Sequence, residues 1–161
     1  MDIQVRTASP EETESWGERL ARVLQPGTIL GLAGELGAGK TCFVRGLATG
    51  LGVNPEAVHS PTFTLIAEHH TGRLPLYHID LYRLEGVEIE ELGLEEYLFG
   101  TGVSAIEWFH FLPRDLVQEH LLITIAFGTG AEERELTFFA QGERYEQMLR
   151  ALVNSAPSFD E

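Results

Sequence analysis

The segment Gly34–Thr41, with the sequence GELGAGKT, constrains the fold of this chain more than any other feature. Two glycines separated by four residues and followed by lysine and threonine form the Walker A pattern. In such a loop the backbone N–H groups point at phosphate oxygens, and the following helix adds its positive N-terminal end. The apolar run Thr28–Ala33 is typical of a buried strand, and residues 40–51 have helical apolar spacing. The sequence therefore predicts a phosphate-binding loop between a strand and a helix.

The basic residues of the chain support this interpretation. Lysine and arginine together number 11, and Lys40 is the only lysine among them. Lys40 can reach the β- and γ-phosphates of a nucleotide, and the hydroxyl of Thr41 can bind Mg²⁺. Guanine recognition through an Asn-Lys-x-Asp motif needs a second lysine, so the chain is not expected to be a Ras-like GTPase. Cys42 follows on the first helical turn, and we expect it to be an inert buried thiol.

Mg²⁺ held by Thr41 also needs a carboxylate at the end of a neighbouring strand. Two apolar runs end in an acid, Leu76–Asp80 and Val103–Glu107. Spacing alone does not choose between Asp80 and Glu107, and either could be an ordinary hydrogen-bonded residue at a strand end. Thr62 follows Ser60-Pro61 and could sense the γ-phosphate, as switch loops do, or could belong to a simple turn before a strand.

The remaining pattern predicts a single α/β domain over residues 1–153. A helix begins after Ser9, because Ser9 and Glu12 suit the N-cap and N3 positions. We also expect two antiparallel hairpins, a strand, an acidic helix, a final helix and a disordered tail. The hairpins are expected over residues 62–69 with 74–82 and over 121–127 with 135–140, and the strand over 103–107. The acidic helix is expected over 85–98, the final helix over 143–153 and the disordered tail over 154–161. A first short strand is expected over residues 3–7.

Composition limits the partners and the compartment. The formal net charge is −14, which disfavours stand-alone binding to nucleic acid and docking on an anionic membrane surface. A single cysteine cannot form an internal disulfide, and the six histidines suggest no metal site. No signal peptide is evident, and no apolar run approaches the roughly 20 residues needed to cross a bilayer. We therefore expect a cytoplasmic protein.

Four segments occur in an order that resembles the TsaE (YjeE) family. They are GELGAGKT at residues 34–41, SPTFT at 60–64, HIDLYR at 78–83 and IEW at 106–108. The resemblance spans residues from about 5 to 140. It implies a P-loop NTPase-type mixed sheet with a parallel core, antiparallel edge strands and flanking helices, in agreement with the predicted hairpins.

The resemblance also implies roles for individual residues. It favours Glu107 over Asp80 as the carboxylate that binds Mg²⁺ with Thr41. Asp80 then orients water or contacts the nucleotide, so the expected catalytic residues are Lys40, Asp80 and Glu107. The expected nucleotide-binding residues are Thr7, Gly34, Glu35, Leu36, Gly37, Ala38, Gly39, Lys40, Thr41, Cys42, Thr62, Trp108 and Arg134.

Members of the family are small bacterial ATPases required for threonylcarbamoyladenosine formation at position 37 of tRNA. The resemblance implies ATP and Mg²⁺ as cofactors and slow hydrolysis that TsaD and TsaB stimulate, with TsaC acting upstream. Contact with tRNA would be indirect, through that complex. Two alternatives stay open, a P-loop small-molecule kinase and a nucleotide-gated binding module without turnover. The acidic stretch Glu85–Glu96 is a solvated helical face or a docking face for a basic partner.

Overall fold

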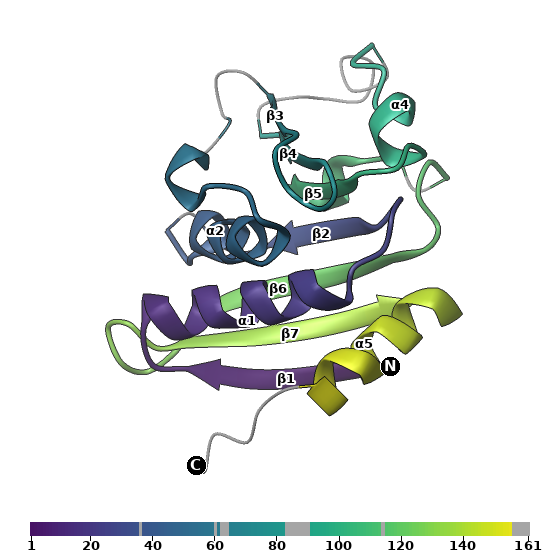
Figure 1. Cartoon of the computed structure of the whole chain (residues 1–161). Helices are drawn as coiled ribbons and strands as arrows, with labels where there is room; N and C mark the ends of the chain where they lie inside the picture. The colour runs from purple at the N-terminus through teal and green to yellow at the C-terminus, as the bar shows by residue number, and fades with distance from the viewer. Residues whose placement is uncertain (36, 60, 62–64, 83–90, 114, 156–161) are drawn as a thin grey trace.

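A computed structural model of the chain describes residues 1–35, 37–59, 61, 65–82, 91–113 and 115–155. Its strands form one seven-stranded sheet in the order β1-β7-β6-β2-β5-β4-β3 (Figure 1). The strands are β1 Asp2–Thr7, β2 Ile29–Ala33, β3 Ile66–His69, β4 Leu76–Asp80, β5 Val103–Glu107, β6 His120–Phe127 and β7 Arg134–Gln141. The helices are α1 Pro10–Val23, α2 Lys40–Leu51, α4 Glu95–Leu98 and α5 Glu143–Ser155, with short 3₁₀ turns η1 Pro55–Ala57 and η2 Phe109–Phe111.

The sheet has a parallel centre and antiparallel edges. β2 pairs in parallel with β5 on one side and β6 on the other, and β5 pairs in parallel with β4. β7 and then β1 are added antiparallel beyond β6, and β3 is added antiparallel beyond β4. This arrangement confirms the predicted mixed α/β sheet, and both predicted hairpins are present. β2 is central, so whatever follows its carboxyl end lies in the middle of one sheet edge.

Helices α1, α2 and α5 cover one face of the sheet (Figure 1). Their apolar sides and the strands enclose the larger hydrophobic core, which includes Leu20, Leu30, Leu32, Phe43, Leu47, Phe138 and Leu149. α1 and α2 cross closely through glycines. A Cβ added at Gly17 or Gly46 would meet the backbone carbonyl oxygen of the other helix, at Phe43 or Glu14. The close crossing fixes the position of the amino end of α2 relative to α1.

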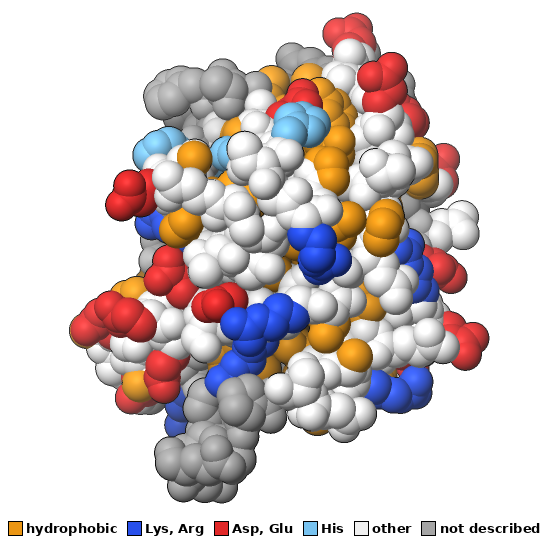
Figure 2. Space-filling view, viewed as in Figure 1, with side chains coloured by type: hydrophobic (Ala, Val, Ile, Leu, Met, Phe, Trp, Pro, Cys, Tyr) orange, Lys and Arg blue, Asp and Glu red, His pale blue; other side chains and the backbone are white. Residues whose placement is uncertain are grey.

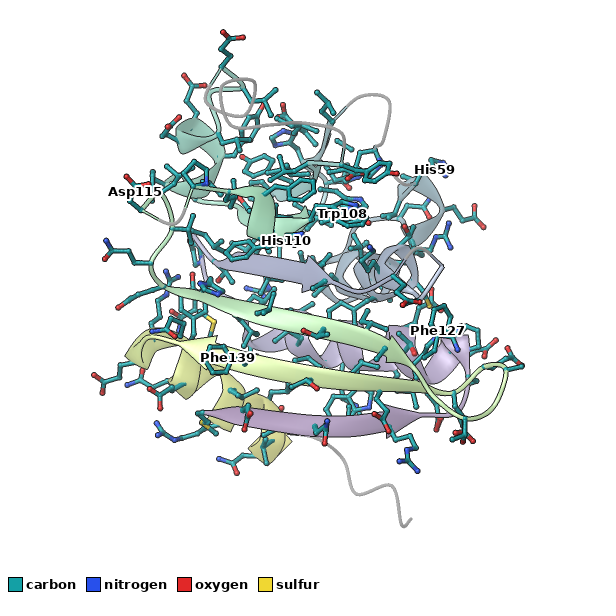
Figure 3. The ribbon with its side chains drawn as sticks, turned by 180° about the vertical axis from the view of Figure 1, so that it is seen from behind. His59, Trp108, His110, Asp115, Phe127 and Phe139 are labelled. Carbon is teal, nitrogen blue, oxygen red and sulfur yellow. The ribbon has the colours of Figure 1, made fainter. Side chains whose placement is uncertain are left out.

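A second, smaller core lies on the opposite face, at the β4 and β5 end of the sheet. It includes Ile29, Ile79, Leu81, Leu94, Leu98 and Ile106. Viewed from behind, the ribbons of β6, β7 and β1 have no helix in front of them, and Phe139 lies on this side (Figure 3). Phe139 is 40% exposed.

Several predicted boundaries differ from the structure. Within the described residues, the expected helix over 85–98 is reduced to α4 Glu95–Leu98 after a turn, and residues 83–90 lie outside them. α5 continues through Ser155, so Asn154 and Ser155 are helical rather than the start of a tail. No helix in the described ranges is long and apolar enough to cross a membrane.

Candidate functional site

The predicted phosphate loop follows the carboxyl end of central strand β2 and leads directly into α2. Gly39 caps α2 with a φ of 115°, and neither a side-chain cap nor an acidic residue occupies the first turn. Gly34 has a φ of 145°, and a Cβ there would collide with the carbonyl oxygen of Ile125 on β6. Both positions therefore need glycine. The positive end of the α2 dipole is left open to an anion.

Lys40 lies folded into this loop. Its side chain is buried, with the residue 5% exposed, and its Nζ donates a hydrogen bond of 2.6 Å to the carbonyl oxygen of Gly34. The ammonium also lies 4.5 Å from the centre of the Trp108 ring. A buried ammonium has three N–H donors and is stabilised by an opposite charge. A phosphate bound in the loop would supply both the acceptors and the charge.

The two carboxylates that the sequence left open end neighbouring strands at this same edge. Asp80 and Glu107 are paired in the register of β4 and β5, so their side chains share a face of the sheet. That face is the α2 side. Leu76 and Ala105 lie an even number of positions before Asp80 and Glu107 on the same strands, so they share this face, and both belong to the larger core. Asp80 is 3% exposed and Glu107 is 5% exposed. The fold brings both acids together beside the loop.

Each carboxylate has a hydrogen-bond partner. Asp80 Oδ1 accepts from the backbone N–H of Tyr82 at 2.9 Å. Glu107 Oε2 and His78 Nε2 are 2.5 Å apart. Thr41, at the first turn of α2, is half-buried and provides a hydroxyl on the loop side of the site. Carboxylate and hydroxyl oxygens are the donors that Mg²⁺ prefers, so Thr41 and Glu107 suit this ion.

An aromatic group closes one side of the site. Trp108 directly follows Glu107 and has a φ of 61°, which turns the chain sharply at the end of β5. Its ring packs against Tyr82 at 5.0 Å and Phe111 at 5.6 Å between ring centres. Figure 3 shows Trp108 and His110 close together at the end of this strand. Trp108 is therefore a wall of the loop region that also contacts Lys40, and it is only half-buried.

A pocket of about 250 Å³ lies beside the loop, between α1 and the connection from β6 to β7. Its lining residues are Pro10, Thr13, Gly37, Ala38, Gly39, Cys42, Glu132 and Arg134. Arg134 reaches the loop from β7, and its Nε donates to the carbonyl oxygen of Ala38 at 2.9 Å. The pocket thus brings the predicted Cys42 and Arg134 to the loop.

Cys42 is half-buried rather than fully buried as expected, in an environment that suppresses the thiolate. Its Sγ donates to the carbonyl oxygen of Pro10 at 3.2 Å. Burial, followed by the charge of nearby Glu14, raises the pKa of the thiol to about 11. This is the environment expected for an inert cysteine, because the reactive species is the thiolate.

Thr7 does not line the pocket. It is 1% exposed, and its hydroxyl is hydrogen-bonded to that of Thr13 at 2.8 Å, so Thr13 stands between Thr7 and the pocket. The structure thus places Thr13, and not Thr7, at the surface of the pocket, and the nucleotide contact of Thr7 stays a prediction. Sequence reasoning missed Thr13, Pro10 and Glu132. The available signal was a polar residue on the inward face of α1, one turn before Gly17 and two before Leu20.

Two predicted residues cannot be placed, because Leu36 and Thr62 lie outside the described residues. Glu35 lies in the described part of the loop and is exposed. Apart from Thr7, the remaining residues predicted to bind the nucleotide or the metal, or to act in catalysis, lie in the loop, in the pocket beside it or at the ends of the neighbouring strands.

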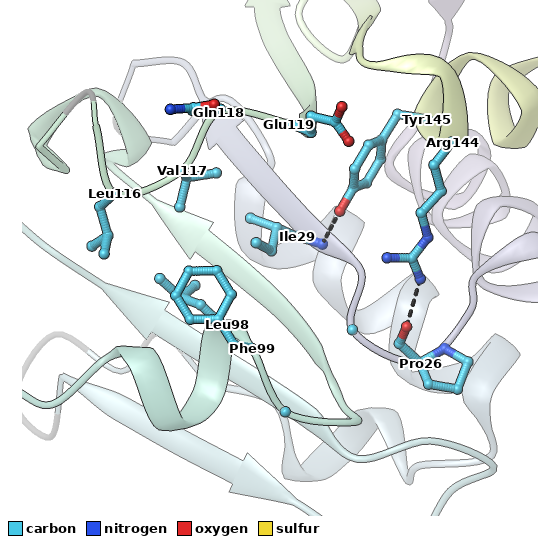
Figure 4. A pocket seen from close by; sticks show the side chains of 12 residues that line it. Pro26, Ile29, Leu98, Phe99, Leu116, Val117, Gln118, Glu119, Arg144 and Tyr145 are labelled. Atoms are coloured by element: carbon cyan, nitrogen blue, oxygen red, sulfur yellow. Dashed lines mark hydrogen bonds between the residues drawn. The ribbon is translucent and has the colours of Figure 1, made fainter.

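A larger pocket of about 420 Å³ lies elsewhere and contains none of the predicted residues. It surrounds the start of β2, where Ile29 N–H donates to Tyr145 Oη at 2.9 Å (Figure 4). Arg144 donates to the carbonyl oxygen of Pro26 at 2.5 Å on its rim (Figure 4). The phosphate loop is at the other end of β2, and ligands of open α/β sheets bind at carboxyl ends of strands. The smaller pocket is therefore favoured as the ligand site by its position beside the phosphate loop, not by its volume.

Known proteins resemble this chain along most of its length. The sequence model of the family described as "Threonylcarbamoyl adenosine biosynthesis protein TsaE" matches residues 7–136. A Bacillus subtilis protein named tRNA threonylcarbamoyladenosine biosynthesis protein TsaE is 50% identical over 150 residues, 93% of each chain. A Treponema pallidum protein of the same name is 46% identical over 118 residues, 73% of this chain and 86% of its own. The crystal structure of Bacillus subtilis YdiB matches with a TM-score of 0.82 and 43% identity, covering 96% of this chain and 95% of that one.

Proposed function

The chain belongs to the TsaE family, and from this premise we propose that it is a Mg²⁺-dependent ATPase acting in threonylcarbamoyladenosine formation on tRNA. One observation carries the proposal. Lys40, the only lysine of the chain, is buried against the Gly34 carbonyl at the sheet edge where β4 and β5 end in Asp80 and Glu107. A cation, two acids and an open helix N-terminus at one edge of the sheet suit the binding of a nucleoside triphosphate together with its metal ion.

Each residue of the site has a distinct role in this proposal. Lys40 exchanges its bond to Gly34 for the β- and γ-phosphates, and the loop N–H groups hold the same phosphates in place. Thr41 and Glu107 would hold Mg²⁺, which when bound neutralises charge that develops on the phosphate oxygens. Asp80, next to Glu107 in the sheet, orients the attacking water. Arg134, through its bond to Ala38, keeps the loop against β7.

TsaD and TsaB are the proposed partners, with TsaC supplying the activated carbamoyl group upstream. The net charge of −14 supports an indirect relation to tRNA, because phosphate binding needs a basic footprint. On the face shown in Figure 2, acidic side chains lie around the rim and basic ones form small groups between them. Such a surface suits contact with another protein better than contact with a nucleic acid.

Phosphate release with and without TsaD and TsaB tests the proposal. We expect slow hydrolysis by the chain alone and faster hydrolysis with the partners. Lys40→Ala and Glu107→Gln should each lower the stimulated rate by on the order of 100-fold. Lys40→Ala removes a positive charge that stabilises the transition state, and Glu107→Gln weakens the hold on the metal ion that does the same. Glu146→Gln is the matched control, because Glu146 is a glutamate of α5 paired with Arg150, and α5 begins at the end of the sheet opposite the loop. Its rate should equal that of the wild type.

The same assay separates the alternatives. ATP consumption that yields a phosphorylated metabolite instead of free phosphate would make the chain a kinase. ATP binding with no phosphate release, even with both partners, would make it a nucleotide-gated binding module. An unchanged stimulated rate for Lys40→Ala or Glu107→Gln would contradict the assignment of the site.

A further inference from the structure

His78 is a histidine at the centre of the candidate site whose role is not explained by any step above. It lies on β4 and its side chain is 0% exposed. Its Nε2 is 2.5 Å from Oε2 of Glu107, whose side chain is 6% exposed. A contact this short, between two side chains sealed from water, fixes the orientation of both groups.

The strand register explains why these two side chains meet. His78 is opposite Ala105, and Asp80 is opposite Glu107, in the parallel pairing of β4 and β5. Side chains at alternate positions share a face, so His78, Asp80, Ala105 and Glu107 all point to the α2 side. Ala105 has only a methyl group, which leaves room for the imidazole to reach diagonally to Glu107.

The chemistry of the pair sets the direction of the hydrogen bond. An ionised carboxylate only accepts, so Nε2 of His78 carries the hydrogen and donates it to Oε2. His78 Nδ1 is buried and has no hydrogen-bond partner among the residues that the structure describes. A hydrogen on Nδ1 would be a buried donor without an acceptor among those residues. Nε2 of His78 is therefore the donor in this hydrogen bond, and Oε2 of Glu107 is the acceptor.

We propose that His78 is a positioning residue for Glu107. It holds Oε2 through Nε2–H, so that the other carboxylate oxygen is presented to the Mg²⁺ of the bound nucleotide. The inference rests on the proposed function, because it assumes that Glu107 binds the metal. Hydrogen bonds of this kind behind a metal ligand contribute about 10–100-fold to metal affinity.

The test compares ADP affinity with Mg²⁺ and with EDTA, so that no turnover is involved. His78→Phe keeps a ring and removes the donor, and His78→Gln offers an amide N–H close to the position of Nε2. His78→Phe should reduce the gain in affinity that Mg²⁺ provides by at least about tenfold and leave the affinity in EDTA unchanged. His78→Gln should recover most of the gain. His120→Phe is the control, because His120 is a partly buried strand histidine that packs against Phe109, and it should not alter the gain.

A second measurement keeps the inference testable if the phenylalanine ring does not fit. His78→Leu removes the same donor within a smaller volume, and thermal unfolding shows which variants are folded. In a Glu107→Gln background, removal of the donor should cause no further loss of the Mg²⁺-dependent gain. An equal and independent loss in both backgrounds would overturn the inference.

Other outcomes contradict different parts of the account. If all His78 variants retain the full Mg²⁺-dependent gain, or if they weaken ADP binding equally in Mg²⁺ and EDTA, His78 has a merely structural role. If the wild-type protein binds ADP equally well in Mg²⁺ and EDTA, the proposed metal role of Glu107 fails, and the inference fails with it.

Discussion

At the scale of single residues, the site depends on charged and hydrogen-bonding side chains that are buried or half-buried in the protein. Lys40 has a carbonyl oxygen on one side and the face of Trp108 on the other. Glu107 has one oxygen occupied by His78. Cys42, two positions after Lys40, is held as a neutral thiol next to the same loop. These residues are fixed before any ligand arrives, which reduces the ordering that binding would otherwise require.

The raised pKa of Cys42 predicts slow alkylation. With a pKa of about 11, only about one thiol in a thousand is ionised at pH 8, so iodoacetamide should react on the order of 100-fold more slowly than with free cysteine. The rate should increase as the pH rises towards 11. The pKa is raised in the folded state, so this group stabilises the fold below its unfolded pKa, and that contribution is lost as the pH rises through the folded value. Mass spectrometry measures the extent of labelling, and rapid modification at pH 8 would contradict the raised pKa of this half-buried, hydrogen-bonded thiol.

At the scale of helices and strands, the strand–loop–helix unit was predictable because its signals are local. The apolar run before Gly34, the glycine spacing and the helical pattern after Lys40 all lie within a continuous segment, and β2 and α2 have nearly the expected bounds. The choice between Asp80 and Glu107 was not predictable from spacing, because both end neighbouring strands and meet only through the sheet order. Thr13 was missed for a related reason. Its place at the pocket depends on how α1 crosses α2, which is a tertiary contact.

The glycine-mediated crossing of α1 and α2 gives a prediction whose sign opposes helix propensity. In an exposed helix, replacing glycine by alanine stabilises by about 1 kcal/mol. In Gly46→Ala the new methyl group would meet the carbonyl oxygen of Glu14 on α1, so we expect the free energy of unfolding to fall by about 1–3 kcal/mol. Urea denaturation measures this change. Thr49→Ala, at an exposed position of the same helix, is the control and should be neutral or slightly stabilising.

A Gly46→Ala protein that is more stable than the wild type would show that the helices do not pack this closely. The displacement of α2 should also weaken nucleotide binding, because the amino end of this helix forms one side of the phosphate loop. Thr49→Ala should leave nucleotide affinity unchanged, since Thr49 lies towards the other end of α2.

At the scale of the whole molecule, the central question is which end of the sheet would bind the proposed nucleotide. The carboxyl ends of β2, β4 and β5 bring together the loop, Lys40 and both acids. The larger pocket at the amino end of β2 offers more volume and one arginine, Arg144. The net charge of −14 makes the position of each cation important, because a polyphosphate must be held against an overall negative field.

The most direct test is the dissociation constant of a non-hydrolysable ATP analogue with Mg²⁺, measured by calorimetry for two variants. Lys40→Ala removes the cation of the phosphate loop, and Arg144→Ala removes the cation of the larger pocket. A hydrogen bond to a charged group contributes about 1.5–3 kcal/mol, so Lys40→Ala should weaken binding by roughly 10- to 100-fold. Arg144→Ala should bind like the wild type. Unchanged affinity for Lys40→Ala, or a loss confined to Arg144→Ala, would contradict the account.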